Sequence, residues 1–122
     1  MSANIQEILA GLQKTYLASI PEKVKNLEAL FKANDLEKLE TEYHKLKGTG
    51  RTYGLPEFTQ LGATLERICE TSAKSLPVAV PLSLDLLTRM RDARIQLTEI
   101  HLDLEPDYQT LLKLVDTASE HS

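Results

Sequence analysis

A histidine followed at helical spacing by two cations and a glycine is the set of residues in this chain best suited to chemistry. Lys47 and Gly48 stand three and four positions after His44, and Arg51 follows about one turn later. A neutral imidazole is a nucleophile near pH 7. Lys47 and Arg51 can bind a dianionic group through charge-assisted hydrogen bonds. These residues predict a site that carries an anionic group and is loaded and unloaded by other proteins.

Two glycines follow the histidine inside a run of residues that otherwise favours a helix. Each glycine in a helix interior costs about 1 kcal/mol relative to alanine, so Gly48 and Gly50 require an explanation. Gly48 lies four residues after His44, and side chains four apart lie on the same face of a helix. The missing side chain at Gly48 therefore leaves one edge of the imidazole open to an approaching partner.

The apolar positions of this helix predict where the histidine points. At about 100° per residue, His44 lies about 120° from the centre of the apolar stripe, on the solvent side. Its face also carries Glu40 and Thr41 as candidate binding residues. Glu40 either makes an ordinary contact one turn away or orients the imidazole. The stripe consists of Leu36, Leu39, Tyr43 and Leu46.

The composition indicates one helical, cytoplasmic domain. The 122 residues carry a net charge of −4, 42% of them are hydrophobic, and none is tryptophan. The acidic charge argues against nucleic-acid binding, and the single cysteine, Cys69, argues against a disulfide or a cysteine-based metal cluster. No apolar run is long enough to span a membrane, and the first residues lack the features of a signal peptide. We expect no metal, no nucleic acid and no membrane partner.

Helix signals begin near the N-terminus. A first helix is expected over residues 3–18, followed at 19–22 by Ser-Ile-Pro-Glu, which is typical of a capping box with an early proline. The second helix is expected over 20–33. Asn34 suits the position after its end, and Asp35 suits the N-cap of the next helix. So short a connection predicts that the second and third helices are antiparallel.

The third helix is expected over residues 36–52, and it carries His44. Gly54 suits the turn that ends it. A fourth helix follows over 56–73, with a buried stripe that includes Cys69 as a small buried hydrophobe. Its remaining apolar positions are Phe58, Leu61, Leu65 and Ile68.

The C-terminal part is expected to hold a loop and two further helices. Two prolines within residues 75–81 predict a loop there. Ser83 suits the N-cap of a fifth helix, which the apolar spacing extends to residue 104, and Pro106 breaks the chain before a last short helix. The seam of the fifth helix comprises Leu86, Met90, Ala93, Leu97, Ile100 and Leu104.

Together these helices predict an all-α fold with a single domain over residues 1–122. An antiparallel four-helix bundle is expected over 19–104. Residues 1–18 supply an accessory helix, and residues 105–122 supply a C-terminal helix and tail.

The glycine-rich motif around His44 continues into the fourth helix. The stretch His-x-Leu-Lys-Gly-Thr-Gly at 44–50, with Gly54 ten residues after the histidine, resembles the signature of histidine-containing phosphotransfer (HPt) domains. The resemblance is close over residues 35–66 and looser over 19–71. Gly50 departs from the Ser or Ala commoner at its position, which would loosen the helix end without affecting the chemistry. The similarity in the fourth helix rests on Phe58, Leu61, Leu65 and Glu66.

The resemblance implies a four-helix bundle whose exposed histidine takes a phosphoryl group from a receiver-domain aspartyl phosphate and passes it to another receiver. By position, His44 is the implied phosphoacceptor, Lys47 the phosphate-facing cation, Gly48 the clearance residue and Gly54 the turn after the helix. The partners are response-regulator receivers or a hybrid histidine kinase, which supply the Mg²⁺, so the chain needs no cofactor of its own. We expect a monomeric phosphocarrier rather than an autonomous enzyme.

Two other functions stay open at the level of sequence. A helical interaction module would bind a receiver or another protein without carrying phosphate. An enzyme would use His44 as a covalent intermediate in phosphohydrolysis. Taken alone, His44 would be an ordinary surface histidine, but the Leu-Lys-Gly context and the two costly glycines favour phosphotransfer. His101 and His121 have no metal partner at suitable spacing.

Overall fold

A computed structural model describes residues 4–120 of the chain, with side chains for residues 4–115. The described residues contain no strand, so the predicted all-α class is confirmed. None of the described helices is both long and apolar enough to cross a membrane. The helices are α1 (Ile5–Ala18), α2 (Ile20–Lys32), α3 (Leu36–Thr52), α4 (Pro56–Thr71), α5 (Leu76–Ile95) and α6 (Pro106–Glu120), with short 3₁₀ turns η1 (Ala73–Ser75) and η2 (Leu102–Leu104).

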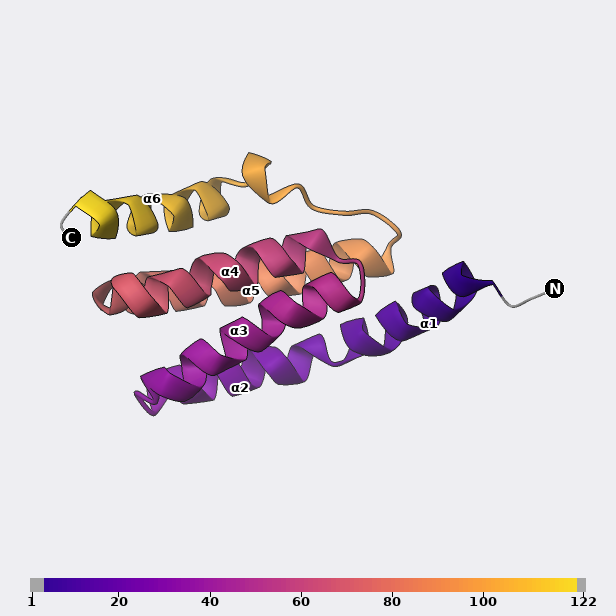
Figure 1. Ribbon diagram of the computed structural model, residues 1–122, viewed down its shortest axis with the longest axis horizontal. Helices are drawn as coiled ribbons and strands as arrows, with labels where there is room; N and C mark the ends of the chain where they lie inside the picture. The colour runs from indigo at the N-terminus through magenta and orange to yellow at the C-terminus, as the bar shows by residue number, and fades with distance from the viewer. Residues whose placement is uncertain (1–3, 121–122) are drawn as a thin grey trace.

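Four helices, α2 to α5, form an antiparallel bundle (Figure 1). Helix α3 packs most closely against α4, and α2 packs against α5. Helix α6 lies along α4 and α5, while α1 extends beyond the bundle at the end where α3 finishes (Figure 1). The centre of the bundle is filled by fully buried side chains that include Leu39, Tyr43, Phe58, Leu61, Leu65, Leu86, Leu87 and Met90.

The predicted ends of the helices around α3 are confirmed. Asn34 adopts the left-handed conformation, with φ of 58°, after the end of α2. The side chain of Asp35 caps α3 by accepting a hydrogen bond from the backbone nitrogen of Lys38 at 3.3 Å. Gly54 also adopts the left-handed conformation, with φ of 68°, which is common for the residue that follows the end of a helix. Local sequence signals thus fix both ends of α3.

The predicted capping box at residues 19–22 is wrong. Ser19 has helical backbone angles, and its hydroxyl donates to the carbonyl oxygen of Tyr16 at 2.6 Å rather than capping α2. Helix α1 therefore passes into α2 with little interruption. Its own N-cap is Asn4, whose side chain accepts from the backbone nitrogen of Glu7 at 2.8 Å. Residue 3, the predicted start, lies outside the described residues.

The predicted loop over residues 75–81 is also wrong, because α5 begins at Leu76 and contains both prolines. Pro77 lies in the first turn, where a backbone N–H has no partner within the helix. Pro81 is exposed on the surface of the helix and removes one backbone hydrogen bond. Burial of Leu76 and Val80 on the inner face offsets that loss.

Ser83 is not the predicted N-cap but a fully buried residue inside α5. Its hydroxyl donates to the carbonyl oxygen of Val80 at 2.8 Å and pairs with the hydroxyl of Tyr43 at 2.6 Å. Burial is the main cause that raises the pKa of Tyr43 well above its ordinary value. This contact joins α5 to α3 across the bundle and satisfies two polar groups that would otherwise be costly to bury.

Helix α5 ends at Ile95, nine residues before the predicted end. Leu97 takes the left-handed conformation, with φ of 62°, and its side chain is 93% exposed. The backbone nitrogen of Thr98 donates to the carbonyl oxygen of Ala93 at 2.8 Å, which closes the end of the helix. The apolar spacing that predicted a continuous helix to residue 104 therefore has no structural counterpart beyond Ile95.

Candidate functional site

His44 lies on the outer side of α3, with its side chain 63% exposed. The preceding residue, Tyr43, is fully buried on the inner side of the same helix. The exposure follows from the apolar period of α3, because residues one position apart point about 100° from each other. An imidazole in this position is accessible to another protein.

Glu66 of α4 joins the two principal residues of the site. Its Oε2 lies 2.7 Å from Nδ1 of His44, and its Oε1 lies 2.7 Å from Nζ of Lys47. The Glu66 side chain is largely buried between the helices, and Lys47 is about one-third exposed. One carboxylate thus holds both predicted residues in a fixed arrangement.

Two glycines at the contact between α3 and α4 permit this arrangement. A Cβ atom at Gly62 of α4 would lie 2.6 Å from the backbone nitrogen of Lys47 and 2.9 Å from the carbonyl oxygen of Tyr43. A Cβ at Gly50 of α3 would lie 2.5 Å from the backbone nitrogen of Thr59. Of the two roles left open for Gly62, close helix packing is thus the one observed. Gly50 likewise serves this packing rather than loosening the helix end.

The charge on Glu66 decides which nitrogen of His44 carries a proton in the contact between the two side chains. The hydrogen bond from Lys47 lowers the pKa of Glu66, burial opposes that effect, and the contact with His44 adds to the lowering. Because an ionised carboxylate can only accept hydrogen bonds, Nδ1 of His44 is the nitrogen that carries the proton. In the neutral imidazole, the lone pair is therefore on Nε2, the ring nitrogen that is not bonded to Glu66.

The space beside His44 is open, because a Cβ atom at Gly48 would meet no atom within 4 Å. Arg51 is exposed one turn further along and forms no ion pair with any described residue. Thr41 is exposed as well, but its hydroxyl donates to the carbonyl oxygen of Glu37 at 3.0 Å. The structure therefore gathers His44 and Lys47 around Glu66 and leaves Arg51 and Thr41 at the rim.

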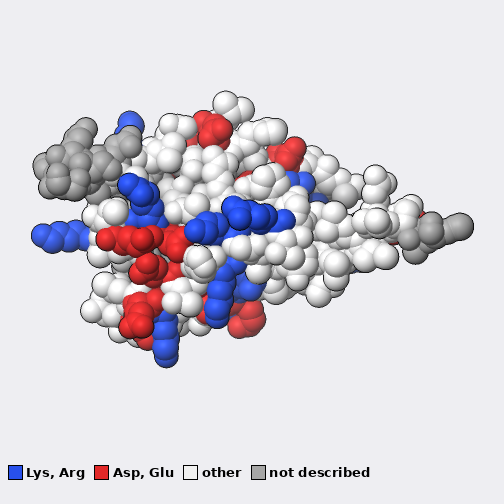
Figure 2. Space-filling model, viewed as in Figure 1, with Lys and Arg blue, Asp and Glu red and all other residues white. Residues whose placement is uncertain are grey.

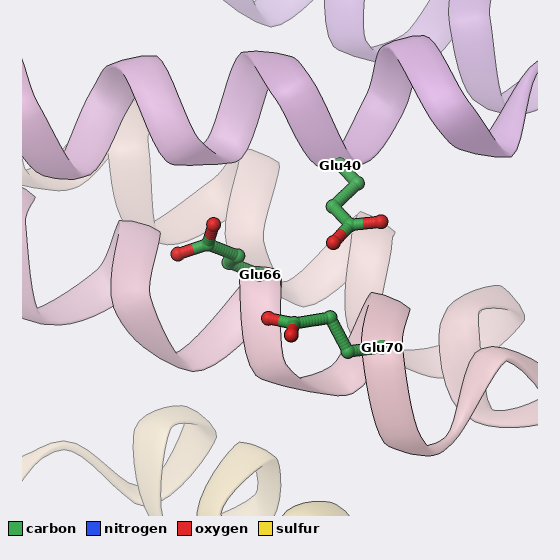
Figure 3. A group of neighbouring side chains, drawn as sticks. All are labelled: Glu40, Glu66 and Glu70. Atoms are coloured by element: carbon green, nitrogen blue, oxygen red, sulfur yellow. The ribbon is translucent and has the colours of Figure 1, made fainter.

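Glu40 does not orient the imidazole, since the carboxylate bonded to His44 is Glu66. Glu40 extends from α3 toward Glu66 and Glu70 of α4, and one oxygen of each lies within 4.8 Å of the others (Figure 3). Both oxygens of Glu66 are already bonded, so we assign no metal ion to this group. Cys69 is half-buried nearby, where burial, with smaller contributions from these carboxylates, raises its pKa to about 12.

Glu66 is the site residue that the sequence did not single out. It belongs to the motif that resembles HPt domains, yet it stands 22 positions after His44. Helical periodicity relates residues of one helix to each other and says nothing about which residue of a second helix faces them. The one available signal is that Glu66 follows a buried leucine on the side of α4 that packs on α3.

The face of the molecule over α3 and α4 is strongly polar. In Figure 2, acidic and basic side chains gather side by side over these two helices, whereas the part of the same face over α1 is almost uncharged. The basic residues of α3 near the histidine are Lys45, Lys47 and Arg51, and the acidic residues around it are Glu37, Glu40, Glu66 and Glu70.

An accessible histidine held by a carboxylate on a helix bundle can act as a nucleophile toward a group that another protein presents. The family model of the Hpt domain matches residues 11–117, which is most of the chain. The chain therefore belongs to the HPt domain family, whose members carry out histidine phosphotransfer in two-component signalling together with receiver domains and histidine kinases. They are phosphocarrier modules rather than catalysts. Comparisons with curated proteins and with solved structures gave no match.

Proposed function

We propose that His44 accepts a phosphoryl group from the aspartyl phosphate of a receiver domain and passes it to a second receiver in a multistep His-Asp relay. The observation that carries the proposal is the contact of 2.7 Å between Nδ1 of His44 and Glu66 on an otherwise accessible imidazole. This contact fixes the ring and leaves Nε2 free to react.

The transfer step follows from that assignment. The lone pair of Nε2 attacks the phosphorus atom, the N–P bond forms, and the bond between phosphorus and the aspartate oxygen breaks. The aspartate leaves as a carboxylate with the bonding electron pair, and the proton stays on Nδ1, which donates it in the hydrogen bond to Glu66. The reverse sequence on a second receiver restores the free imidazole, so the chain is neither consumed nor required to supply a proton.

Lys47 supports the phosphorylated state. Its ammonium group is already held beside the imidazole by Glu66, and a dianionic phosphoryl group on Nε2 offers it a second anionic partner. Arg51 provides a further cation at the rim. Gly48 gives the receiver room to bring its aspartate in line with Nε2, where correct alignment of the reacting atoms accounts for much of the rate.

The partner supplies what this chain does not hold. The receiver brings the Mg²⁺ ion that neutralises charge on the transferring phosphoryl group. The chain brings a positioned nucleophile and acts in the cytoplasm as a monomeric carrier. Its complexes with receivers are transient, because a carrier must release its cargo, and this calls for a small interface.

Incubation with a panel of receiver domains phosphorylated on their aspartates tests the proposal. We expect radiolabelled phosphate to appear on the wild-type chain as an acid-labile, alkali-stable adduct that mass spectrometry maps to His44. Binding without labelling would favour a helical interaction module that carries no phosphate. Release of inorganic phosphate by the chain in the absence of a receiver would favour a phosphohydrolase.

A further inference from the structure

The turn that ends α5 carries a leucine where the backbone favours glycine. Leu97 adopts the left-handed conformation, with φ of 62°, which residues with a Cβ atom rarely adopt and which glycine adopts readily. Its backbone nitrogen donates to the carbonyl oxygen of Arg94 at 3.0 Å, and that of Thr98 donates to the carbonyl oxygen of Ala93 at 2.8 Å. These two bonds form a Schellman motif, in which the left-handed residue is usually glycine.

The folded chain gains almost nothing from the side chain of Leu97. This side chain is 93% exposed, so it adds little buried apolar area to the core. Ile95, two positions earlier, is 59% exposed. Backbone strain of this kind clusters at binding and switch sites. The strain and the exposure together point to a contact that Leu97 makes outside the chain.

Leu97 and Ile95 form one wall of an apolar groove at this end of the bundle. The other wall is the side of α1 that carries Ala10, Leu17 and Ala18, and the groove has a volume of about 420 Å³. The stretch of α1 from residue 10 to residue 18 is about 12 Å long, which matches two turns of a second helix. The small side chains at its two ends allow such a helix to approach α1 closely.

The two cations that line the groove differ in whether they have a partner. Arg94 donates to Glu57 at 2.6 and 2.8 Å and to Glu99 at 3.1 Å. Lys14 is exposed and forms no ion pair with any residue that the structure describes. The free charge beside the apolar walls is therefore positive, and an acidic residue of a ligand would complement it.

The groove is separate from the surface around His44. No residue of α3 lines the groove, and α3 packs mainly on α4 and α2 rather than on α5. In Figure 1, α5 lies behind α4, whereas the charged region over α3 and α4 faces the viewer in Figure 2. We therefore expect a ligand in the groove to leave His44 accessible to a second protein.

We propose that this groove binds an amphipathic helix of a partner protein, whose apolar stripe covers Leu97 and Ile95 and whose flank carries an acidic residue beside Lys14. Amphipathic helices bind apolar grooves through residues at i, i+3, i+4 and i+7. An extended peptide binds by adding a strand to a sheet edge, and the described residues contain no sheet. The groove thus holds the carrier on one protein while its histidine serves another.

A second copy of the chain is the less favoured occupant. Its own exposed apolar helix face consists of Ile5, Ile8 and Leu12 on α1. At about 100° per residue, this face points away from the side of α1 that forms the groove. Insertion of one copy into the groove of the next would therefore be heterologous and would build open chains rather than a closed dimer.

A synthetic amphipathic helix about 15 residues long, with leucines at i, i+3, i+4, i+7 and i+11 and glutamates on the flank, is the probe for this site. We expect it to bind the full chain saturably in fluorescence anisotropy. Leu97→Gly should weaken binding about tenfold or more, because one leucine is no longer buried against the probe. The same change should raise the melting temperature by about 2–5 °C, because glycine relieves the strain.

Three further variants make the test specific. Leu97→Asn should weaken binding as much as Leu97→Gly does, because asparagine tolerates the left-handed conformation but is polar. Leu104→Asn is the matched control, because Leu104 is 78% exposed and does not line the groove, and it should bind as wild type does. Lys14→Glu should weaken binding of the glutamate probe about threefold and should bind a lysine version of the probe more tightly than wild type does.

The outcomes decide the proposal independently of the role of His44. Equal binding by wild type and both Leu97 variants, or no saturable binding by wild type, would overturn it. A concentration-dependent assembly of the wild-type chain that Leu97→Gly abolishes would overturn it in favour of a second copy. Transfer from a phosphorylated receiver to His44 should proceed at an unchanged rate with the probe bound, and competition between probe and receiver would show that the two sites are not separate.

Discussion

The two sides of α3 use glycine for opposite purposes. On the side that meets α4, Gly50 and its counterpart Gly62 lie in contacts so close that a single Cβ atom would come within 2.6 Å of a backbone nitrogen. On the outer side, Gly48 has nothing within 4 Å of the place where its Cβ would be. The inner glycines serve packing between helices, whereas the outer glycine leaves open space beside the helix.

The comparison shows how a rigid helix can present a reactive group. Close contact with α4 brings Glu66 within hydrogen-bond distance of His44 and Lys47, so the packed side determines the geometry of the open side. On the open side, His44 and Gly48 are exposed, so substitutions there should change stability little. Changes on the outer side should therefore affect transfer, and changes on the inner side should affect folding.

The largest effect is expected for His44→Gln on the outer side. It should abolish phosphoryl acceptance, because glutamine has no nucleophilic nitrogen, while the free energy of unfolding changes by about 0.5 kcal/mol or less, as at other exposed sites. Radiolabel transfer from a phosphorylated receiver and chemical denaturation measure the two quantities. A large loss of stability would show that the outer side of α3 is structural after all.

Gly48→Leu should slow transfer by about 100-fold, because the new side chain fills the space through which the receiver approaches and misplaces the reacting groups. The same change should stabilise the free chain by up to about 1 kcal/mol, since leucine favours a helix more than glycine does. A time course of transfer and a thermal melt on one sample test both. Normal transfer by this variant would remove the access role of Gly48.

Gly62→Ala on the inner side should destabilise the fold by about 1–3 kcal/mol through overpacking. The clash involves the backbone of α3, which cannot move aside as a flexible side chain would. Urea denaturation measures the change. A stability equal to that of wild type would show that the two helices separate easily, and the contrast between the two sides would then fail.

Glu66→Ala should slow transfer about tenfold, the effect expected for the loss of a charge-assisted hydrogen bond that orients the nucleophile. Glu66→Gln is the matched variant, because its carbonyl oxygen can still accept from Nδ1 of His44, and it should recover most of the rate. Rates measured under single-turnover conditions distinguish the variants. Equal rates for Glu66→Ala and wild type would show that Glu66 does not position the imidazole.

The stability difference between wild type and Glu66→Gln should also depend on pH. Because the pKa of Glu66 is lowered in the folded chain, its carboxylate stabilises the fold above the ordinary titration range of glutamate, and this contribution disappears as the pH falls through the lowered value. Glu66→Gln should therefore be less stable than wild type at neutral pH, and the difference should shrink in acid. Thermal melts across this range measure it.

The smallest effect is expected for Gly48→Ala. The same substitution at Gly62 should destabilise the fold, whereas at Gly48 it should stabilise it. Alanine at an open position of a helix should stabilise the chain by up to about 1 kcal/mol, and its single methyl group should leave transfer close to the wild-type rate. Denaturation of Gly48→Ala and Gly62→Ala side by side makes the comparison direct. Destabilisation of both variants would mean that the outer side is as closely packed as the inner one.

Local signals in the sequence predicted the surroundings of His44 well. The period of Leu39, Tyr43 and Leu46 placed these residues inside and the histidine outside. Asn34 and Gly54 were correctly assigned to left-handed positions, because these residue types tolerate positive φ at little cost. Each of these signals acts within a few residues, so the sequence contains it directly.

The errors arose where packing outweighed a local preference. Pro81 and Ser83 are poor residues for a helix interior, yet α5 passes through both because its inner face is buried against the bundle. Leu97 takes a left-handed conformation that leucine disfavours, so no sequence rule places the end of α5 before it. The early end of α5 and the course of the chain toward α6 are properties of the whole fold.

The sequence by itself determined that this chain is helical, that α3 turns His44 outward, and that the glycine-rich motif resembles that of HPt domains. The tertiary structure alone decided that Glu66 holds His44 and Lys47 and that Gly62 rather than Gly48 allows the close packing. The physical reason is distance along the chain. Periodicity relates residues within one helix, whereas the contact between residues 44 and 66 exists only because two helices pack at one particular register.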